Sequence, residues 1–145
     1  MKFQTSLSSM TKFGSVILAI TLLGLQLSPA YAAHGLYTSN LNGAQEVPPN
    51  AATGTAMGNL TLTVTAITCS VSVSGLTGVP TAAHIHQGPP GANGPIIVTL
   101  TGIVVGFNPP TSFFCTSATL TPAQIADLDA GNLYFNVHTA AFPGG

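Results

Sequence analysis

The sequence has 145 residues, of which only two are basic and three are acidic. Both basic residues, Lys2 and Lys12, lie near the N-terminus, and no lysine or arginine follows them. The sequence after Lys12 therefore has no permanent cation with which to hold phosphate, which argues against nucleic acid and anionic membrane surfaces as partners of that part of the chain.

The first 32 residues have the pattern of a secretory signal peptide. The two lysines flank a polar start, an apolar run extends from Val16 to Leu27, and Ala30 and Ala32 form an A-x-A cleavage motif. The apolar run is shorter than the roughly 20 residues that cross a bilayer. We therefore expect a cleaved signal peptide over residues 1–32 and a secreted or periplasmic mature domain over residues 33–145, with no membrane span.

The three acidic residues of the mature chain form no recognisable catalytic pattern. Asp127 and Asp129 are two residues apart on a predicted helix and therefore do not share a face. Glu46 is followed by Pro48 and Pro49, and we expect it to be a single solvated acid. The sequence also contains no G-x-S-x-G motif. These observations favour a protein without an enzyme active site.

Cys69 and Cys115 each lie in a strand-like run of a chain that is expected to enter an oxidising compartment. The sequence leaves two alternatives open: one disulfide between two strands, or two buried free thiols. A catalytic thiol is less favoured than either, because the chain has no C-x-x-C motif and no basic residue beside either cysteine.

The first part of the mature chain predicts a β-hairpin. Apolar residues occupy even positions in one run (Leu60, Leu62, Val64) and odd positions in the next (Ile67, Cys69, Val71, Val73). One regular strand cannot change parity without turning its core face outward, so a tight turn or a bulge is expected near Thr65 and Ala66, and we interpret the two runs as a hairpin. We predict that each set of apolar residues faces the core.

Further strands are predicted along the rest of the chain. One covers Ala82–His86 and is followed by the loop QGPPGANG at 87–94. The apolar run PIIVTL at 95–100 predicts a strand that is buried on both sides or central. An extended segment is expected on each side of the Pro-Pro turn at 109–110, and a last strand follows at 132–139.

The segment TPAQIADLDAG predicts the only helix, near 121–130. Thr121 is a natural N-cap, Pro122 suits the first helical position, and Gly131 can end the helix. Ile125 and Leu128 form a small apolar stripe. The fold class that follows is all-β: an antiparallel, Greek-key-like β-sandwich with one short helix.

Four polar residues on two predicted strands form the candidate site: His84, His86, Asn136 and His138. Residues two apart in a strand share a face, so the first two histidines lie opposite Ala83 and Ile85. In the last strand, the other two lie opposite Leu133, Phe135 and Val137. If the two strands are neighbours, three imidazoles converge on one surface patch.

Three neutral imidazoles can bind copper(II) or zinc(II). This hypothesis makes His84, His86 and His138 the ligands and Asn136 either a weak fourth ligand or a residue that supports the ligands. The alternative is structural, because histidines beside Gly-Pro turns often only hydrogen-bond to loop carbonyls. His34 stands apart as the second residue after the expected cleavage site, where an amine and a histidine can chelate copper, although free termini are commonly disordered.

Four segments together resemble one known family. They are LNGAQEVPP (41–49), GTAMGNLTLTV (54–64), VSGLTGVPTAAHIHQGPPGANGPIIVTL (73–100) and LTPAQIADLDAGNLYFNVHTAAFPGG (120–145). The sequence resembles the CHRD domain, named for the repeats of chordin and also found singly in exported bacterial proteins. The resemblance implies an immunoglobulin-like or superoxide-dismutase-like β-sandwich. It also implies a further strand of Glu-Ile-Arg-Gly-Gln type after Pro-Gly-Gly, so we expect a truncated chain with an open edge strand that can pair with another chain.

Two functions compete at this point. The first is a non-enzymatic, exported binding or interaction module that recognises an extracellular protein or a small ligand through a sandwich face and the loop HQGPPGANG. The second is a copper- or zinc-binding protein, favoured by the similarity of the H-x-H strand to that of copper-zinc superoxide dismutase. A complete dismutase is not expected, because it requires further histidine ligands, an aspartate ligand near them and an arginine, and this chain has no arginine.

Overall fold

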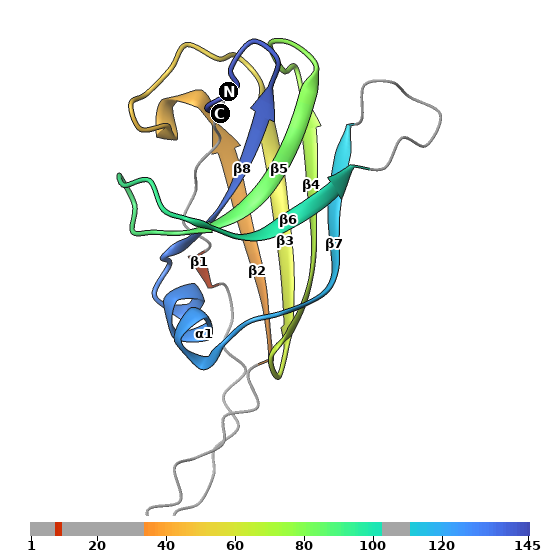
Figure 1. Ribbon diagram of the computed structural model, residues 1–145, viewed down its shortest axis with the longest axis vertical. Helices are drawn as coiled ribbons and strands as arrows, with labels where there is room; N and C mark the ends of the chain where they lie inside the picture. The colour runs from red at the N-terminus through yellow and green to blue at the C-terminus, as the bar shows by residue number, and fades with distance from the viewer. Residues whose placement is uncertain (1–7, 10–33, 103–110) are drawn as a thin grey trace, which may run out of the picture.

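Alternating apolar side chains arrange the chain into antiparallel strands. The computed structural model describes residues 8–9, 34–102 and 111–145. The strands are β1 (Ser8–Ser9), β2 (His34–Asn42), β3 (Thr55–Thr63), β4 (Ala66–Ser74), β5 (Pro80–Gln87), β6 (Ile96–Gly102), β7 (Ser112–Thr119) and β8 (Leu133–Thr139). A 3-10 turn, η1 (Gly43–Gln45), follows β2, and the helix α1 (Pro122–Asp129) precedes β8 (Figure 1).

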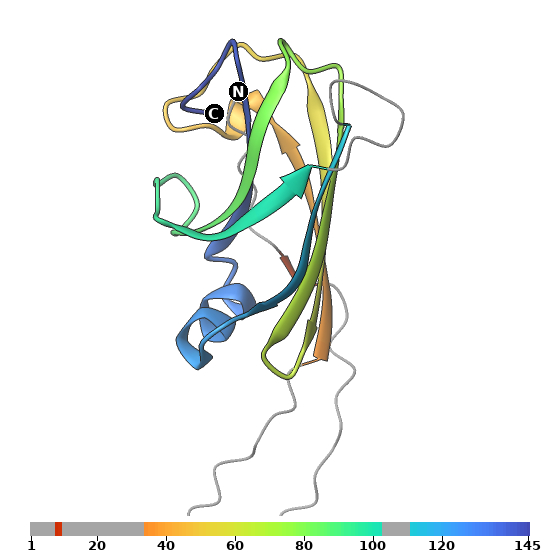
Figure 2. The same ribbon diagram turned by 45° about the vertical axis from the view of Figure 1, so that its right-hand side comes forward.

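The strands form one continuous sheet in the order β1-β2-β3-β4-β7-β6-β5-β8. This sheet folds over on itself, so that β2, β3, β4 and β7 face β5 and β8, while β6 crosses between the layers (Figure 2). The crossing is held by the pairs Thr101–Phe114 and Gly102–Phe113. The prediction of an all-β antiparallel fold is confirmed, and the two layers are joined into a nearly barrel-shaped sheet.

The predicted hairpin is confirmed as β3 and β4, which pair from Thr55–Ser74 to Thr63–Ala66. Two residues, Val64 and Thr65, make the turn, and Val64 has the left-handed φ of 58°. The prediction that Val64 faces the core is wrong, because the turn takes this side chain out of the strand and leaves it exposed. The strand β3 therefore ends at Thr63, one residue before the last residue of the apolar pattern.

The apolar run that forms β6 is less buried than predicted. In this strand only Leu100 is buried, Ile96 is exposed, and Ile97 and Val98 are partly exposed. The expectation of a strand buried on both sides is therefore wrong. β6 crosses between the layers, so that Leu100 enters the core while Ile97 and Val98 only pack against it. The predicted extended segment before the Pro-Pro turn falls mainly on residues 103–110, outside the described residues.

The predicted helix is confirmed. Thr121 and Gln124 form a capping box, in which the Thr121 hydroxyl accepts from the Gln124 backbone amide at 3.2 Å and the Gln124 side chain accepts from the Thr121 amide at 2.8 Å. Leu128, on the inner side of the helix, is fully buried. Gly131 follows the end of the helix and has a φ of 77°. The helix therefore begins and ends where its capping residues require.

Two aspartates attach α1 to the sheet. The Tyr37 hydroxyl on β2 donates to Asp129 Oδ1 at 2.7 Å, and the Asn132 side chain donates to Asp127 at 3.1 Å. Gln87, at the end of β5, also donates to Asp127. These hydrogen bonds lower the pKa of Asp127, whereas burial and the contact with Asp129 raise the pKa of Tyr37.

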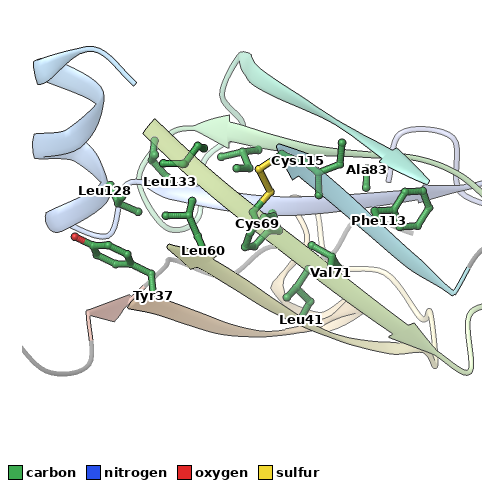
Figure 3. Close-up of a cluster of buried hydrophobic side chains, with 14 of the residues drawn as sticks. Tyr37, Leu41, Leu60, Cys69, Val71, Ala83, Phe113, Cys115, Leu128 and Leu133 are labelled. Atoms are coloured by element: carbon green, nitrogen blue, oxygen red, sulfur yellow. A yellow bond between two sulfur atoms is a disulfide. The ribbon is translucent and has the colours of Figure 1, made fainter. Parts of the chain in front are cut away.

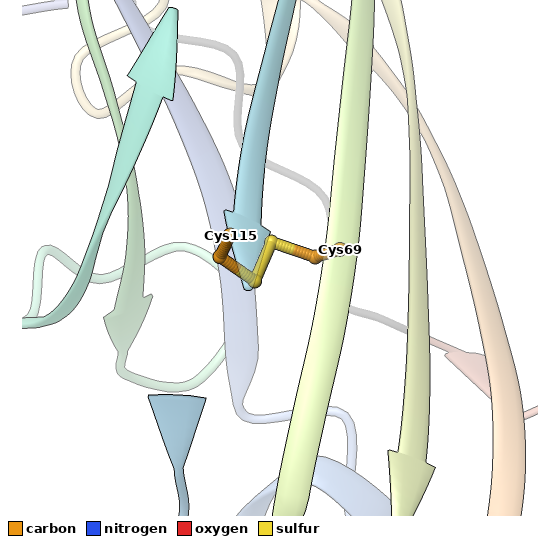
Figure 4. The surroundings of a disulfide bond; sticks show 2 residues. All are labelled: Cys69 and Cys115. Carbon is orange, nitrogen blue, oxygen red and sulfur yellow. A yellow bond between two sulfur atoms is a disulfide. The ribbon is translucent and has the colours of Figure 1, made fainter. Parts of the chain in front are cut away.

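The core lies between the layers and receives inward-facing residues from β2 to β8, together with Leu128 of α1 (Figure 3). Cys69 on β4 and Cys115 on β7 are direct cross-strand partners, with Cα atoms 4.9 Å apart, and form a disulfide (Figure 4). The layers pack tightly at Gly58, since a Cβ atom there would lie 2.4 Å from the ring of Phe135.

The predicted signal peptide lies outside the described residues except for Ser8 and Ser9, which pair with β2. Across the described ranges 8–9, 34–102 and 111–145, no helix is long and apolar enough to cross a membrane.

Candidate functional site

The strands that carry the predicted site residues are neighbours. In the antiparallel pairing of β5 with β8, Ala82 lies opposite His138, His84 opposite Asn136, and His86 opposite Tyr134. Ala83 and Ile85 point into the core, as predicted from the alternation. The three imidazoles were expected to converge only if these two strands were neighbours, and β5 and β8 are neighbours.

The three histidines form a compact cluster. His84 Nδ1 lies 3.0 Å from His138 Nε2, and the ring centroids of His84 and His86 are 5.7 Å apart. One potential ligand nitrogen from each imidazole lies within 4.8 Å of the other two. Elsewhere in the described part of the chain, no other three histidine, cysteine or acidic residues come together in this way.

Backbone carbonyls orient two of the imidazoles. His86 Nδ1 contacts the Gly94 carbonyl oxygen at 2.8 Å, and His138 Nδ1 contacts the Pro143 carbonyl oxygen at 3.2 Å. A carbonyl oxygen can only accept, so Nδ1 carries the proton in both rings and Nε2 is the unprotonated nitrogen. Metal-binding histidines commonly show this arrangement, in which a hydrogen bond from one ring nitrogen fixes the tautomer and orients the other.

The cluster favours neutral imidazoles. Burial lowers the pKa of His138 to about 4; the Pro143 carbonyl opposes this shift, and the other two histidines add to it. Burial, followed by the nearby His86, also lowers the pKa of His84. Neutral imidazole is the form that binds metal ions, so near neutral pH little proton competition opposes a metal at these two rings.

The face that carries the cluster is more enclosed than predicted. His86 and Asn136 are buried, while His84 and His138 are partly exposed. The loop at 88–95, the segment at 43–54 and the C-terminal residues 140–145 lie close to this layer (Figure 1). They are linked to one another, because Asn93 donates to the Val47 carbonyl and Asn50 to the Gly145 carbonyl. The site is thus a half-buried cluster and not an open surface patch.

Tyr134 is a site residue that the sequence alone did not identify. Its ring stacks on His86 with a centroid distance of 5.1 Å and an interplanar angle of 11°. Its hydroxyl accepts a hydrogen bond from the Gly94 backbone amide at 2.9 Å. Gly94 thus contacts both rings, one through its amide and the other through its carbonyl. The available signal was the alternation itself, which places Tyr134 on the same face as Asn136 and His138.

The remaining two residues considered in the sequence analysis are Glu46 and His34. Glu46 is only 3% exposed, so the expectation of a solvated acid is wrong. Burial raises the pKa of Tyr134, and the charge of Glu46 adds a smaller contribution in the same direction. Val47, the residue after Glu46, accepts a hydrogen bond from Asn93 in the loop that follows β5, so this segment lies beside that loop. His34 begins β2, where its backbone pairs with Thr63 of β3.

The donor set fits a divalent transition metal. Copper(II) and zinc(II) accept neutral imidazole nitrogens, and zinc–nitrogen bonds of about 2.0–2.1 Å place tetrahedral ligands about 3.3 Å apart. Ligand separations that extend to 4.8 Å require small side-chain rotations to reach this geometry. A bound ion would also displace the proton that His84 Nδ1 donates to His138 Nε2, so the fit requires local adjustment.

Fold and site together define a small antiparallel β domain with a three-histidine cluster on one layer. Residues 37–145 match the family model for the CHRD domain, and the chain belongs to this family. Neither the curated proteins nor the solved structures that were searched include a match to this chain.

Proposed function

We propose that this CHRD domain is an exported, non-enzymatic binding protein whose ligand is a copper(II) or zinc(II) ion. The observation that carries the proposal is the convergence of His84, His86 and His138, with ligand nitrogens within 4.8 Å of one another. The carbonyl groups of Gly94 and Pro143 support it, because they hold two of the imidazoles in the tautomer whose Nε2 is unprotonated and can bind a metal ion.

The chemistry of the donors narrows the class of metal. All three candidate ligands are imidazoles, and the group contains neither thiolate nor carboxylate. Calcium and magnesium prefer oxygen ligands, and copper(I) prefers sulfur. Copper(II) and zinc(II) are therefore the ions for which this site is best suited.

The positions of the three acidic residues of the mature sequence support a binding role. Asp127 and Asp129 both hold α1 against the sheet, as described above. Glu46 is buried on the Tyr134 side of the layer. Among the described residues, the group of possible metal ligands consists of the three histidines and includes no carboxylate.

Export is supported by two features. Residues 1–32 have the charge and apolar pattern of a signal peptide. The Cys69–Cys115 disulfide suits an oxidising compartment. N-terminal sequencing of the protein recovered from the periplasm or medium should therefore begin at Ala33, whereas an intact Met1 on exported protein would contradict cleavage at this site.

Metal titration tests the proposed ligand. The purified exported protein should bind copper(II) or zinc(II) with micromolar or tighter affinity, and the double variant His84→Ala/His86→Ala should lose this binding. The matched control is His34→Ala, which removes a histidine outside the cluster and the copper-chelating potential of the mature N-terminus. Absence of binding by the wild type, or binding that depends on His34 alone, would contradict the proposal.

A second candidate function is strand-mediated interaction with an extracellular protein. The observation that favours it is the position of β8 at one end of the sheet order, where backbone groups can add a strand from another chain. Self-association is the simplest form, and sedimentation should then show a concentration-dependent dimer. A monomer at all accessible concentrations would contradict pairing between copies.

A further inference from the structure

Asn136 lies at the centre of the histidine cluster. It is directly opposite His84 on the neighbouring strand and two residues before His138 on its own strand. Side chains at these positions share a face and lie close together. The Asn136 side chain therefore points toward the space between the imidazoles of the two strands.

The amide of Asn136 is buried without a hydrogen bond from the described residues. Its residue is 0% exposed, and neither Oδ1 nor Nδ2 has a hydrogen-bond partner there. Buried side-chain amides are normally hydrogen-bonded, because losing water without a replacement partner is unfavourable. A buried amide that points into a candidate metal site indicates that its partner arrives with the bound state.

Three protein ligands leave a position open at a metal that takes four. In sites with three protein ligands, water or another small molecule completes the coordination. Neutral imidazoles leave the full positive charge on a divalent ion, and residues 33–145 contain no lysine or arginine that would compete for an anion. A small anion in the open position is therefore attracted to the metal, and an amide N–H can donate to it.

We propose that the fourth coordination position of the bound metal is an exchangeable site for water or a small monoanion. Asn136 Nδ2 donates a hydrogen bond to this ligand. This inference rests on the proposed metal site. Asn136 is a positioning residue in this arrangement and does not contact the metal. The site thus combines a metal held by three imidazoles with a small ligand selected by charge and by a single buried amide.

Azide is a suitable probe, because its coordination to copper(II) gives a charge-transfer absorption band and changes the electron paramagnetic resonance spectrum. The experiment uses the exported His34→Ala protein, so that no second copper site forms at the N-terminus. Copper is titrated first without azide, which tests the proposed function alone. Azide is then titrated into the copper-loaded protein, which tests the exchangeable position.

We expect azide to bind the copper-loaded protein and to shift both spectra. In Asn136→Leu, a variant of similar volume without polar atoms, copper affinity should stay within threefold, whereas azide affinity should fall about tenfold through loss of one hydrogen bond. Asn136→Asp should weaken azide binding further, because a carboxylate repels the anion. This pattern separates support of the anion from support of the metal.

Two results would overturn the inference while leaving the metal proposal intact. If azide leaves the spectra of the copper-loaded protein unchanged, the fourth position is not exchangeable, and this measurement needs no Asn136 variant. If a folded Asn136→Leu protein loses tenfold or more in copper affinity, the amide oxygen binds the metal itself. Absence of copper binding in the first titration would instead refute the proposed function.

Discussion

Gly94 shows how one residue can organise a site that it does not itself form. Its amide donates to the Tyr134 hydroxyl and its carbonyl accepts from His86 Nδ1. A Cβ atom at this position would lie 1.8 Å from the Gln87 carbonyl oxygen, so only glycine fits here without a shift of the loop. Loop position and imidazole orientation are therefore coupled at Gly94.

Gly94→Ala should accordingly weaken metal binding although no ligand is changed. The loop must move away from Gln87, which loosens the hydrogen bond that orients His86, and loss of such an orienting contact commonly costs 10- to 100-fold in metal affinity. Zinc titration measures this loss. Gly144→Ala is the matched control, because a Cβ atom there meets nothing within 4 Å. Equal zinc affinities for both variants would refute the coupling.

Tyr37 provides a pH-dependent contact between β2 and α1. The phenol is buried and donates to Asp129, and both effects raise its pKa above the ordinary value of 10.0. In the unfolded chain this tyrosine ionises near pH 10, whereas the folded chain retains the proton. The folded state therefore binds more protons above pH 10, and its stability must fall as the pH rises.

Tyr37→Phe should reduce the free energy of unfolding by about 1 kcal/mol at pH 7, since one hydrogen bond is lost and the exposed Asp129 stays hydrated. Above pH 10 the difference from the wild type should shrink, because only the wild type loses the contribution of Tyr37. Urea unfolding between pH 7 and pH 11 measures both effects. A difference that remains constant over this range would show that the Tyr37 pKa is not raised in the folded state.

Among the elements, α1 depends on its capping residues more than on its length. The helix has eight residues, too few to be stable alone in water, and its N-terminus is fixed by the Thr121–Gln124 capping box. Removal of the hydroxyl in Thr121→Ala should reduce the free energy of unfolding by about 1 kcal/mol. Thr121→Ser retains the acceptor oxygen and should lose much less, as measured by urea unfolding. Equal losses in both variants would mean that the hydroxyl does not stabilise the helix.

The accuracy of sequence-based prediction varies among the elements for physical reasons. The β3–β4 hairpin and α1 were predictable because local signals determine them: a change of parity in one case and two capping residues in the other. The burial of β6 was not predictable, because it depends on where the sheet folds over, and an apolar run carries no information about this. The limit of the strand near Val64 was missed because valine is apolar whether it lies in a strand or in a turn.

In the candidate site, too, the features set by local sequence were predictable and those set by the packing of distant segments were not. Alternation placed His84 and His86 on the face of β5 that points away from the core, and His138 on the corresponding face of β8. Their convergence depended on whether β5 and β8 were neighbours. The enclosure of the cluster came from distant segments, which explains the missed burial of Glu46 and the missed role of Tyr134. Gly58 illustrates the point, since its tight contact with Phe135 exists only after the two layers pack.

For the whole molecule, the disulfide constrains the largest loop that the described residues show to be covalently closed. Cys69 and Cys115 are separated by 46 positions, and a loop of this length corresponds to about 4 kcal/mol of lost unfolded-state entropy in the chain-entropy model. Single domains have a total stability of only about 5–15 kcal/mol, so this contribution is a large fraction of it. The stability of the domain is thereby tied to the oxidising compartment for which export is proposed.

The variant Cys69→Ala/Cys115→Ala should therefore lose about 3–4 kcal/mol in its free energy of unfolding, measured in urea under oxidising conditions. Wild-type protein unfolded in the presence of a thiol reductant should show a similar loss, because its unfolded chain is no longer cross-linked. Metal affinity of the folded variant should be unchanged, since the disulfide joins β4 and β7 and the histidines lie on β5 and β8. A variant as stable as the oxidised wild type would show that core packing alone maintains the fold, and the domain could then fold equally well in a reducing compartment.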